Sequence, residues 1–153
     1  MAQELRQAGL DPDWKRVDTE SDYLAHLRPE LDVILADYRL PGFDAFRALD
    51  LLKGCALDIP FIIVSGAIGE DTAVAAIKQG AADYLLKDRL ARLGPAVVQA
   101  MDHKRLREEK RRVDEEARLE AQLLDAATDS IFVHDLDGKV VYVNEAADRK
   151  SVV

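Results

Sequence analysis

The stretch Leu31-Asp32-Val33-Ile34-Leu35-Ala36-Asp37 decides the fold class, because a run of mostly apolar residues ends in a carboxylate. Such a run is typical of a strand that is buried on both faces of a parallel sheet. The chain then reaches Pro41-Gly42, where the pattern predicts a break. A helix is expected next, with Phe46, Leu49 and Leu52 on its apolar face.

Two further units of the same kind follow along the chain. Residues 59–64 predict a second buried strand that ends at Ser65-Gly66, and residues 70–79 predict a helix. Residues 82–86 predict a third strand, which ends at Lys87. Strands that alternate with helices predict an α/β fold with a parallel sheet and right-handed crossovers.

The flanking segments are more weakly patterned. Residues 2–9 predict a helix that Gly9 stops, and Trp14-Lys15-Arg16-Val17 is a candidate strand. A helix through Leu27 is expected to begin at Thr19 or at Ser21, either of which can cap it. After the third strand, a helix is expected from about Leu90 to about Ala126, with Pro95 in its opening turns.

Composition narrows the class of protein. The 153 residues carry a net charge of −8, which argues against a nucleic-acid partner, and no apolar run approaches the length of a membrane span. The single cysteine, Cys55, excludes an intramolecular disulfide and fits a reducing compartment. Residues 1–6 contain no hydrophobic signal core, so a cytoplasmic location is expected.

Three predicted strands end in chemically useful side chains: Asp37, Ser65 and Lys87. Ligands of an open parallel sheet bind beyond the carboxyl ends of its strands, so these groups are expected to converge there. A carboxylate can attack phosphorus, while a hydroxyl and an ammonium can bind phosphoryl oxygens. Taken singly, each residue also fits an ordinary helix cap, turn or solvated position; together they favour a functional site.

Three segments, at positions 33–42, 60–66 and 80–87, resemble the receiver domain of two-component response regulators, and the resemblance covers roughly residues 1–100. It implies a flavodoxin-like, doubly wound parallel sheet that is not itself an enzyme. It also implies that Asp37 accepts a phosphoryl group from a histidine kinase or a phosphotransfer protein. Ser65 would be the switch hydroxyl and Lys87 the cation of the site. Tyr84 is equally well explained as the switch aromatic or as strand packing.

The sequence departs from this family at its start. A receiver begins with a strand that ends in an acidic pair, which binds Mg²⁺ beside the phosphoacceptor, and no such pair precedes Asp37 at a suitable place. Asp11 and Asp13 fall in a loop, so the metal site would retain only Asp37 and the backbone carbonyl of Arg39. We therefore expect weak Mg²⁺ binding and weak phosphorylation.

The missing strand is the central one of the order 2-1-3-4-5, so the sheet is expected to be incomplete. The strand at residues 31–36 should then expose an unpaired edge, which predicts a destabilised or aggregation-prone fragment.

The predicted domains are a truncated receiver at 1–96 and a charged helical linker at 97–122. The linker carries a weak heptad whose apolar members are Leu106, Val113, Ala117 and Leu124, interrupted by Lys110 and Glu120. It can be a solvated single helix or, slightly favoured because a long unpaired helix is marginal, a dimeric coiled coil through residues 97–124.

Residues 131–134 and 139–143 flank an Asp-Gly turn, which predicts a β-hairpin. Residues 123–147 resemble the start of a PAS domain; they imply no cofactor, and His134 is interpreted as a strand surface residue. Residues 148–153 abandon this pattern and are interpreted as a non-native tail.

The expected function is a phosphoacceptor module that relays its state through the helix to PAS and output domains. The output of an intact parent would be a histidine kinase or a cyclic-dinucleotide enzyme. The alternative is a pseudo-receiver that serves as a dimerisation scaffold without phosphotransfer. A nucleotide-binding enzyme is disfavoured, because residues 65–69 lack the spacing of a glycine-rich phosphate loop.

Overall fold

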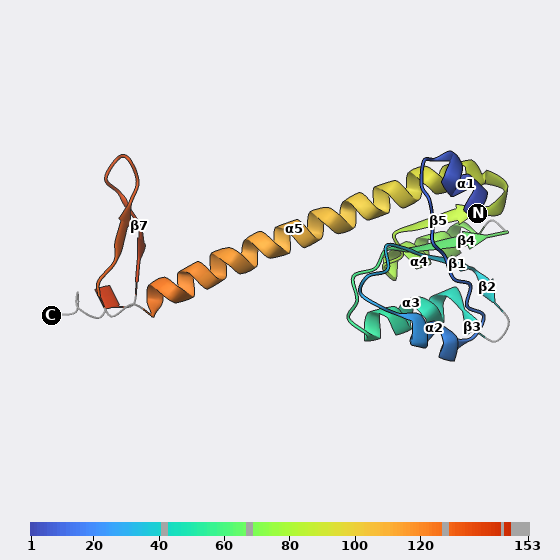
Figure 1. Cartoon of the computed structure of the whole chain (residues 1–153), viewed down its shortest axis with the longest axis horizontal. Helices are drawn as coiled ribbons and strands as arrows, with labels where there is room; N and C mark the ends of the chain where they lie inside the picture. Colours follow the sequence, from blue (N-terminus) through green and yellow to red (C-terminus); the bar gives the residue numbers. More distant parts are fainter. Residues whose placement is uncertain (41–42, 67–68, 127–128, 145, 148–153) are drawn as a thin grey trace. The chain divides into compact units, whose positions relative to one another are not determined.

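The computed structural model describes residues 1–40, 43–66, 69–126, 129–144 and 146–147, which fall into two compact units, 1–106 and 107–153. The first unit is built on a parallel sheet of three strands in the order β1–β4–β5 (Figure 1). These strands are β1 (Ile34–Asp37), β4 (Phe61–Ser65) and β5 (Asp83–Leu86). The predicted α/β fold with a parallel sheet is therefore confirmed.

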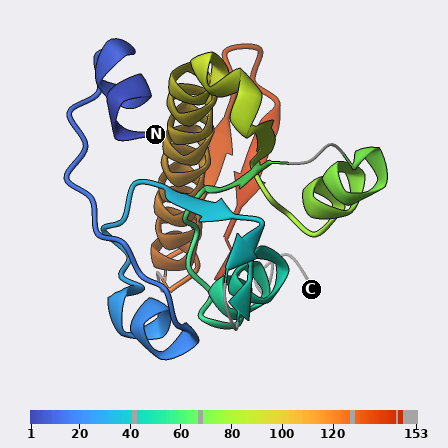
Figure 2. The same ribbon diagram turned by 90° about the vertical axis from the view of Figure 1, so that its right-hand side faces the viewer.

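The central strand β4 is buried along its whole length, and its alternate side chains enter two different cores. Phe61 and Ile63 pack on one face of the sheet, whereas Ile62 and Val64 pack on the other. The first core is covered by α2 (Glu20–His26), α3 (Ala45–Gly54) and α4 (Glu70–Lys78). The second is covered by α1 (Ala2–Gln7) and the first turns of α5 (Leu93–Asp125) (Figure 2).

Local chemistry sets where several helices begin and end. Thr19 rather than Ser21 caps α2, since its side chain accepts a hydrogen bond from the main-chain N–H of Asp22 at 3.2 Å. Asp44 caps α3 in the same way, accepting from the N–H of Arg47 at 2.8 Å. Gly9 follows α1 with a φ of 79°, a left-handed conformation in which glycine is unstrained, as its predicted role as a stop signal requires.

The prediction of a strand at Trp14–Val17 is wrong. These residues form a loop, in which Arg16 pairs with the carboxylate of Asp18 at 2.9 Å. A strand is stable only beside a hydrogen-bonding neighbour, and no described strand pairs with this segment. The apolar side chain of Val17 nevertheless packs against the first core.

The prediction for residues 31–36 is right in type and wrong in extent and burial. Strand β1 begins three residues later and includes Asp37, and only Ala36 within it is buried. The reason is its position: among the described residues β1 is an edge strand, which pairs with β4 on one side.

Two short features were not predicted. Strand β2 (Arg39–Leu40) pairs antiparallel with β3 (Phe43–Asp44), and a 3₁₀ helix, η1 (Lys87–Arg92), precedes α5. The break predicted at Pro41-Gly42 lies outside the described residues.

The second unit contains the C-terminal part of α5 and an antiparallel pair, β6 (Phe132–His134) and β7 (Val140–Val143). The turn between these strands includes Gly138 at a φ of 80°, which explains the Asp-Gly signal in the sequence. The tail at 148–153 lies outside the described residues. Among the helices that the structure describes, none combines the length and the hydropathy that crossing a bilayer requires.

Candidate functional site

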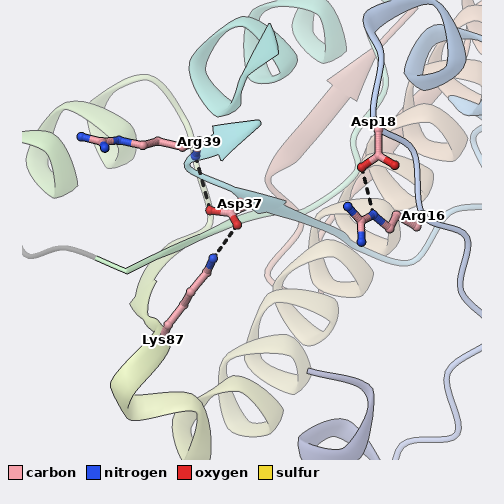
Figure 3. A network of polar contacts seen from close by, with 5 residues as sticks. All are labelled: Arg16, Asp18, Asp37, Arg39 and Lys87. Carbon is pink, nitrogen blue, oxygen red and sulfur yellow. Dashed lines mark hydrogen bonds and ion pairs between the residues drawn. The ribbon is translucent and has the colours of Figure 1, made fainter. Parts of the chain in front are cut away.

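Two of the predicted site residues meet at one edge of the sheet. The ammonium Nζ of Lys87 lies 2.5 Å from Oδ2 of Asp37, and Figure 3 shows the lysine side chain reaching from the end of β5 toward the end of β1. The charges are opposite and the contact is direct, so the two side chains form a hydrogen-bonded ion pair.

The strand register explains how these distant residues come together. Asp37 is the last residue of β1 and pairs with Val64, while Ser65 at the end of β4 pairs with Leu86. Lys87 directly follows Leu86. All three strands are parallel, so their carboxyl ends lie at the same edge, as the strand pattern predicted.

A main-chain group completes the described contacts of Asp37. The backbone N–H of Arg39 donates a hydrogen bond to Oδ1 of Asp37 at 3.3 Å (Figure 3). The sequence led us to consider the carbonyl of Arg39 and not its N–H. The signal was available, however, because an aspartate side chain commonly accepts from the N–H two residues later.

Ser65 and Tyr84 lie on the adjacent strands β4 and β5. Ser65 is 2% exposed at the end of β4. Tyr84 is half-buried in β5, pairs with Ile63 and packs against the first core. This placement fits the packing interpretation of Tyr84, and its role as the switch aromatic stays a prediction.

The ion pair is open to solvent on one side. The side chains of Asp37 and Lys87 are 31% and 46% exposed, so water and salt screen their attraction. The pair consequently contributes little to folding stability, whereas the carboxylate stays accessible to another molecule.

The donors around Asp37 do not make a magnesium site by themselves. Mg²⁺ requires near-octahedral oxygen coordination, but one oxygen of Asp37 faces an ammonium and the other faces an N–H. Among the residues that the structure describes, no group of three or more His, Cys, Asp or Glu side chains is placed to hold a metal ion.

Comparison with known proteins identifies the family. Residues 1–98 match the sequence profile of the response regulator receiver domain. The regulatory protein LuxO of Vibrio cholerae is 37% identical over 79 residues, which are 51% of this chain and 17% of LuxO. The two-component response regulator ORR21 of Oryza sativa subsp. indica is 42% identical over 60 residues, 39% of this chain and 8% of that protein. The chain thus spans less than a fifth of the length of either relative.

Solved structures agree with this fold. A signal receiver domain from Vibrio parahaemolyticus superposes with a TM-score of 0.62 at 25% identity, covering 70% of this chain and 82% of that one. A response regulator receiver domain from Clostridium thermocellum gives a TM-score of 0.58 at 25% identity. The superposition covers 69% of this chain and 85% of that one. With the profile match extending over most of the chain, the protein belongs to the response regulator receiver domain family.

Proposed function

We propose that this chain is a phosphoacceptor module of a two-component phosphorelay, in which Asp37 receives a phosphoryl group from a phosphohistidine. The donor would be a histidine kinase or a phosphotransfer protein. The observation that supports this proposal most directly is the ion pair between Asp37 and Lys87 at the carboxyl edge of the sheet.

In the proposed reaction, an oxygen of Asp37 attacks phosphorus and forms a P–O bond as the P–N bond to the donor histidine breaks. The bonding electrons return to the imidazole nitrogen. Negative charge on the transferring group has to be neutralised in place, and the ammonium of Lys87 is positioned beside the attacking carboxylate. The N–H of Arg39 orients that carboxylate.

Ser65 and Tyr84 are assigned the switching roles in this proposal. Ser65 ends the strand adjacent to β1, and a hydroxyl at this end of the sheet would bond a phosphoryl oxygen. Tyr84 would follow that movement from the next strand. Mg²⁺ is the cofactor associated with the family. By the resemblance its ligands here would be the carboxylate of Asp37 and the carbonyl of Arg39, so we expect uptake to be weak.

Labelling by a small phosphodonor tests the proposal. The full chain, incubated with phosphoramidate, should gain the mass of one phosphoryl group on Asp37, and Asp37→Asn should abolish the gain. Asp88→Asn is the matched control, since Asp88 is an exposed carboxylate one residue from Lys87. Labelling that persists in Asp37→Asn and maps to another residue would contradict the assignment.

We further propose that α5 relays the state of the receiver to a PAS domain that begins with β6 and β7, and that the module itself is cytoplasmic and not an enzyme. The hairpin exposes several apolar side chains, as strands of a larger sheet would: Phe132, Val133, Val140, Val141 and Val143.

Homodimerisation through residues 97–124 is a separate part of the proposal. It would be detected as a concentration-dependent mass in sedimentation equilibrium, and Val113→Glu should abolish it.

The second candidate is a pseudo-receiver scaffold that dimerises without phosphotransfer. It is favoured by the contacts of Asp37, because both carboxylate oxygens already face donors, the ammonium of Lys87 and the N–H of Arg39. A chain that dimerises and takes up no phosphoryl group from any donor would support the scaffold and exclude the phosphoacceptor.

A further inference from the structure

The end of helix α5 is closed by a side chain that lies twenty residues further along the chain. The last four carbonyls of an α-helix lack partners within the helix. The main-chain N–H of Ala126 reaches back to the carbonyl of Gln122 at 3.0 Å, whereas the carbonyl of Leu124 accepts from Nδ2 of Asn144 at 3.0 Å. A residue of the hairpin region therefore caps the helix.

Asn144 uses its whole hydrogen-bonding capacity in this position. Its amide nitrogen also donates to the carbonyl of Asp129 at 2.9 Å. Its oxygen accepts from the N–H groups of Ile131 at 2.9 Å and Ala147 at 3.1 Å. Two donated and two accepted bonds are what a side-chain amide can make, and Asn144 is fully buried, so each lost bond leaves a buried polar group unsatisfied.

A second contact joins the same two elements. The hydroxyl of Tyr142 donates to the carboxylate of Asp125 at 2.7 Å. Tyr142 and Asn144 are two positions apart and so lie on the same side of an extended chain, and they contact consecutive residues at the end of α5. Both contacts fix the last turn of the helix to the end of β7.

We propose that Asn144 is a joint that makes the last turn of α5 and the start of β6 open and close as one cooperative unit. Fraying or rotation of the helix end breaks the bond to Leu124. The remaining bonds of the same amide hold Ile131, so a displaced amide releases the first residues of the hairpin. This proposal concerns the second unit alone and does not depend on phosphorylation of Asp37.

Amide hydrogen exchange on the full chain tests the joint, with the N–H groups of Ala126 and Ile131 as the two reporters. In the unsubstituted protein, both amides should show the same protection and the same dependence on dilute denaturant. Asn144→Ala should lower the protection of both by at least about fivefold, the effect of one net hydrogen bond. Protection in the sheet of the first unit should remain unchanged.

Asn144→Asp keeps the oxygen that accepts from Ile131 and removes the nitrogen that donates to the carbonyls of Leu124 and Asp129. The amide of Ile131 should stay protected from exchange, while the protection of the amide of Ala126 should fall by about fivefold. His134→Ala, which changes a residue at the other end of the hairpin strand, is the control and should alter neither amide. The joint is refuted if Ala126 and Ile131 respond differently to denaturant in the unsubstituted chain, or if Ala126 keeps its protection in both Asn144 variants.

Discussion

Lys87 and Asp37 are fifty positions apart in the chain, yet their side chains form a hydrogen-bonded ion pair at 2.5 Å. The pair depends on the parallel register of three strands, since β4 separates β1 from β5 in the sheet. It brings a fixed cation to the carboxylate that we propose as the phosphoacceptor, and this arrangement makes Lys87 the most informative residue to change.

Replacing Lys87 by alanine should slow phosphoryl uptake at Asp37 by about 100-fold, the usual effect of removing one preorganised group that stabilises developing negative charge. Lys87→Arg retains the charge with a different geometry, so it should slow phosphoryl uptake less than Lys87→Ala does. The rate of labelling by phosphoramidate, followed by intact mass, measures both. Arg89→Ala removes an exposed cation two residues away and should leave the rate unchanged; an equal loss in that variant would mean that general surface charge matters and not the ion pair.

Magnesium should bind this chain weakly. The oxygens of Asp37 face Lys87 and the N–H of Arg39, so a cation has to displace an ammonium and would find too few oxygen ligands. In a titration with MgCl₂ followed by NMR, the amide signals of Asp37 and Arg39 should shift without saturation through the millimolar range. Saturable shifts that disappear in Asp37→Asn would show a complete metal site and contradict this expectation.

The position of β1 at the edge of the sheet should be detectable in the hydrogen-exchange rates of its individual amides. The N–H groups of Ile34 and Tyr38 donate to the carbonyls of Pro60 and Val64 in the direction of β4. Groups on alternate residues of a strand point to opposite sides, so the N–H of Leu35 points away from β4. We expect the amide of Leu35 to exchange at least about fivefold faster than those of Ile34 and Tyr38, as loss of one hydrogen bond implies. Equal protection would show that another segment pairs with this edge.

The sequence predicted those parts of the fold that depend on local pattern. Its predictions failed where the conformation of a segment depends on a pairing partner far away in the chain. The apolar run of β4 predicted a buried strand, and the strand-end positions of Asp37 and Lys87 predicted their convergence. The segment at Trp14–Val17 was also predicted to be a strand, on a weaker pattern, but no described strand pairs with it and it is a loop. Pattern alone does not distinguish the two cases, because pairing is a long-range property.

The contacts of Asn144 illustrate the same limit in the second unit. An asparagine after a predicted strand is an ordinary turn residue by sequence. Its four bonds join residues from Leu124 to Ala147 and become apparent only when the helix end and the hairpin are seen together. The roles of Ser65 and Tyr84 stay predictions, since they concern a phosphorylated state.

Tyr142 provides a spectroscopic measure of the contact between α5 and β7. The hydrogen bond that its hydroxyl donates to Asp125 raises the pKa of Tyr142 from its ordinary value of 10.0 to about 12. The protonated phenol is the form that donates, so the folded state holds this proton more tightly than the unfolded state does. The stabilisation from this contact is therefore complete below pH 10 and is lost as the pH rises toward 12.

A titration of tyrosinate absorbance should resolve this residue. The chain has four tyrosines, and burial raises the pKa of Tyr23 even further, so Tyr23 titrates later still. Tyr142→Phe should remove one ionisation near pH 12, and Asp125→Ala should return the pKa of Tyr142 toward 10, because alanine removes both the acceptor of the hydrogen bond and the negative charge that opposes ionisation. If Asp125→Ala leaves the titration curve unchanged, Tyr142 does not donate to Asp125 in solution, and of these two contacts the bond from Asn144 to the carbonyl of Leu124 remains.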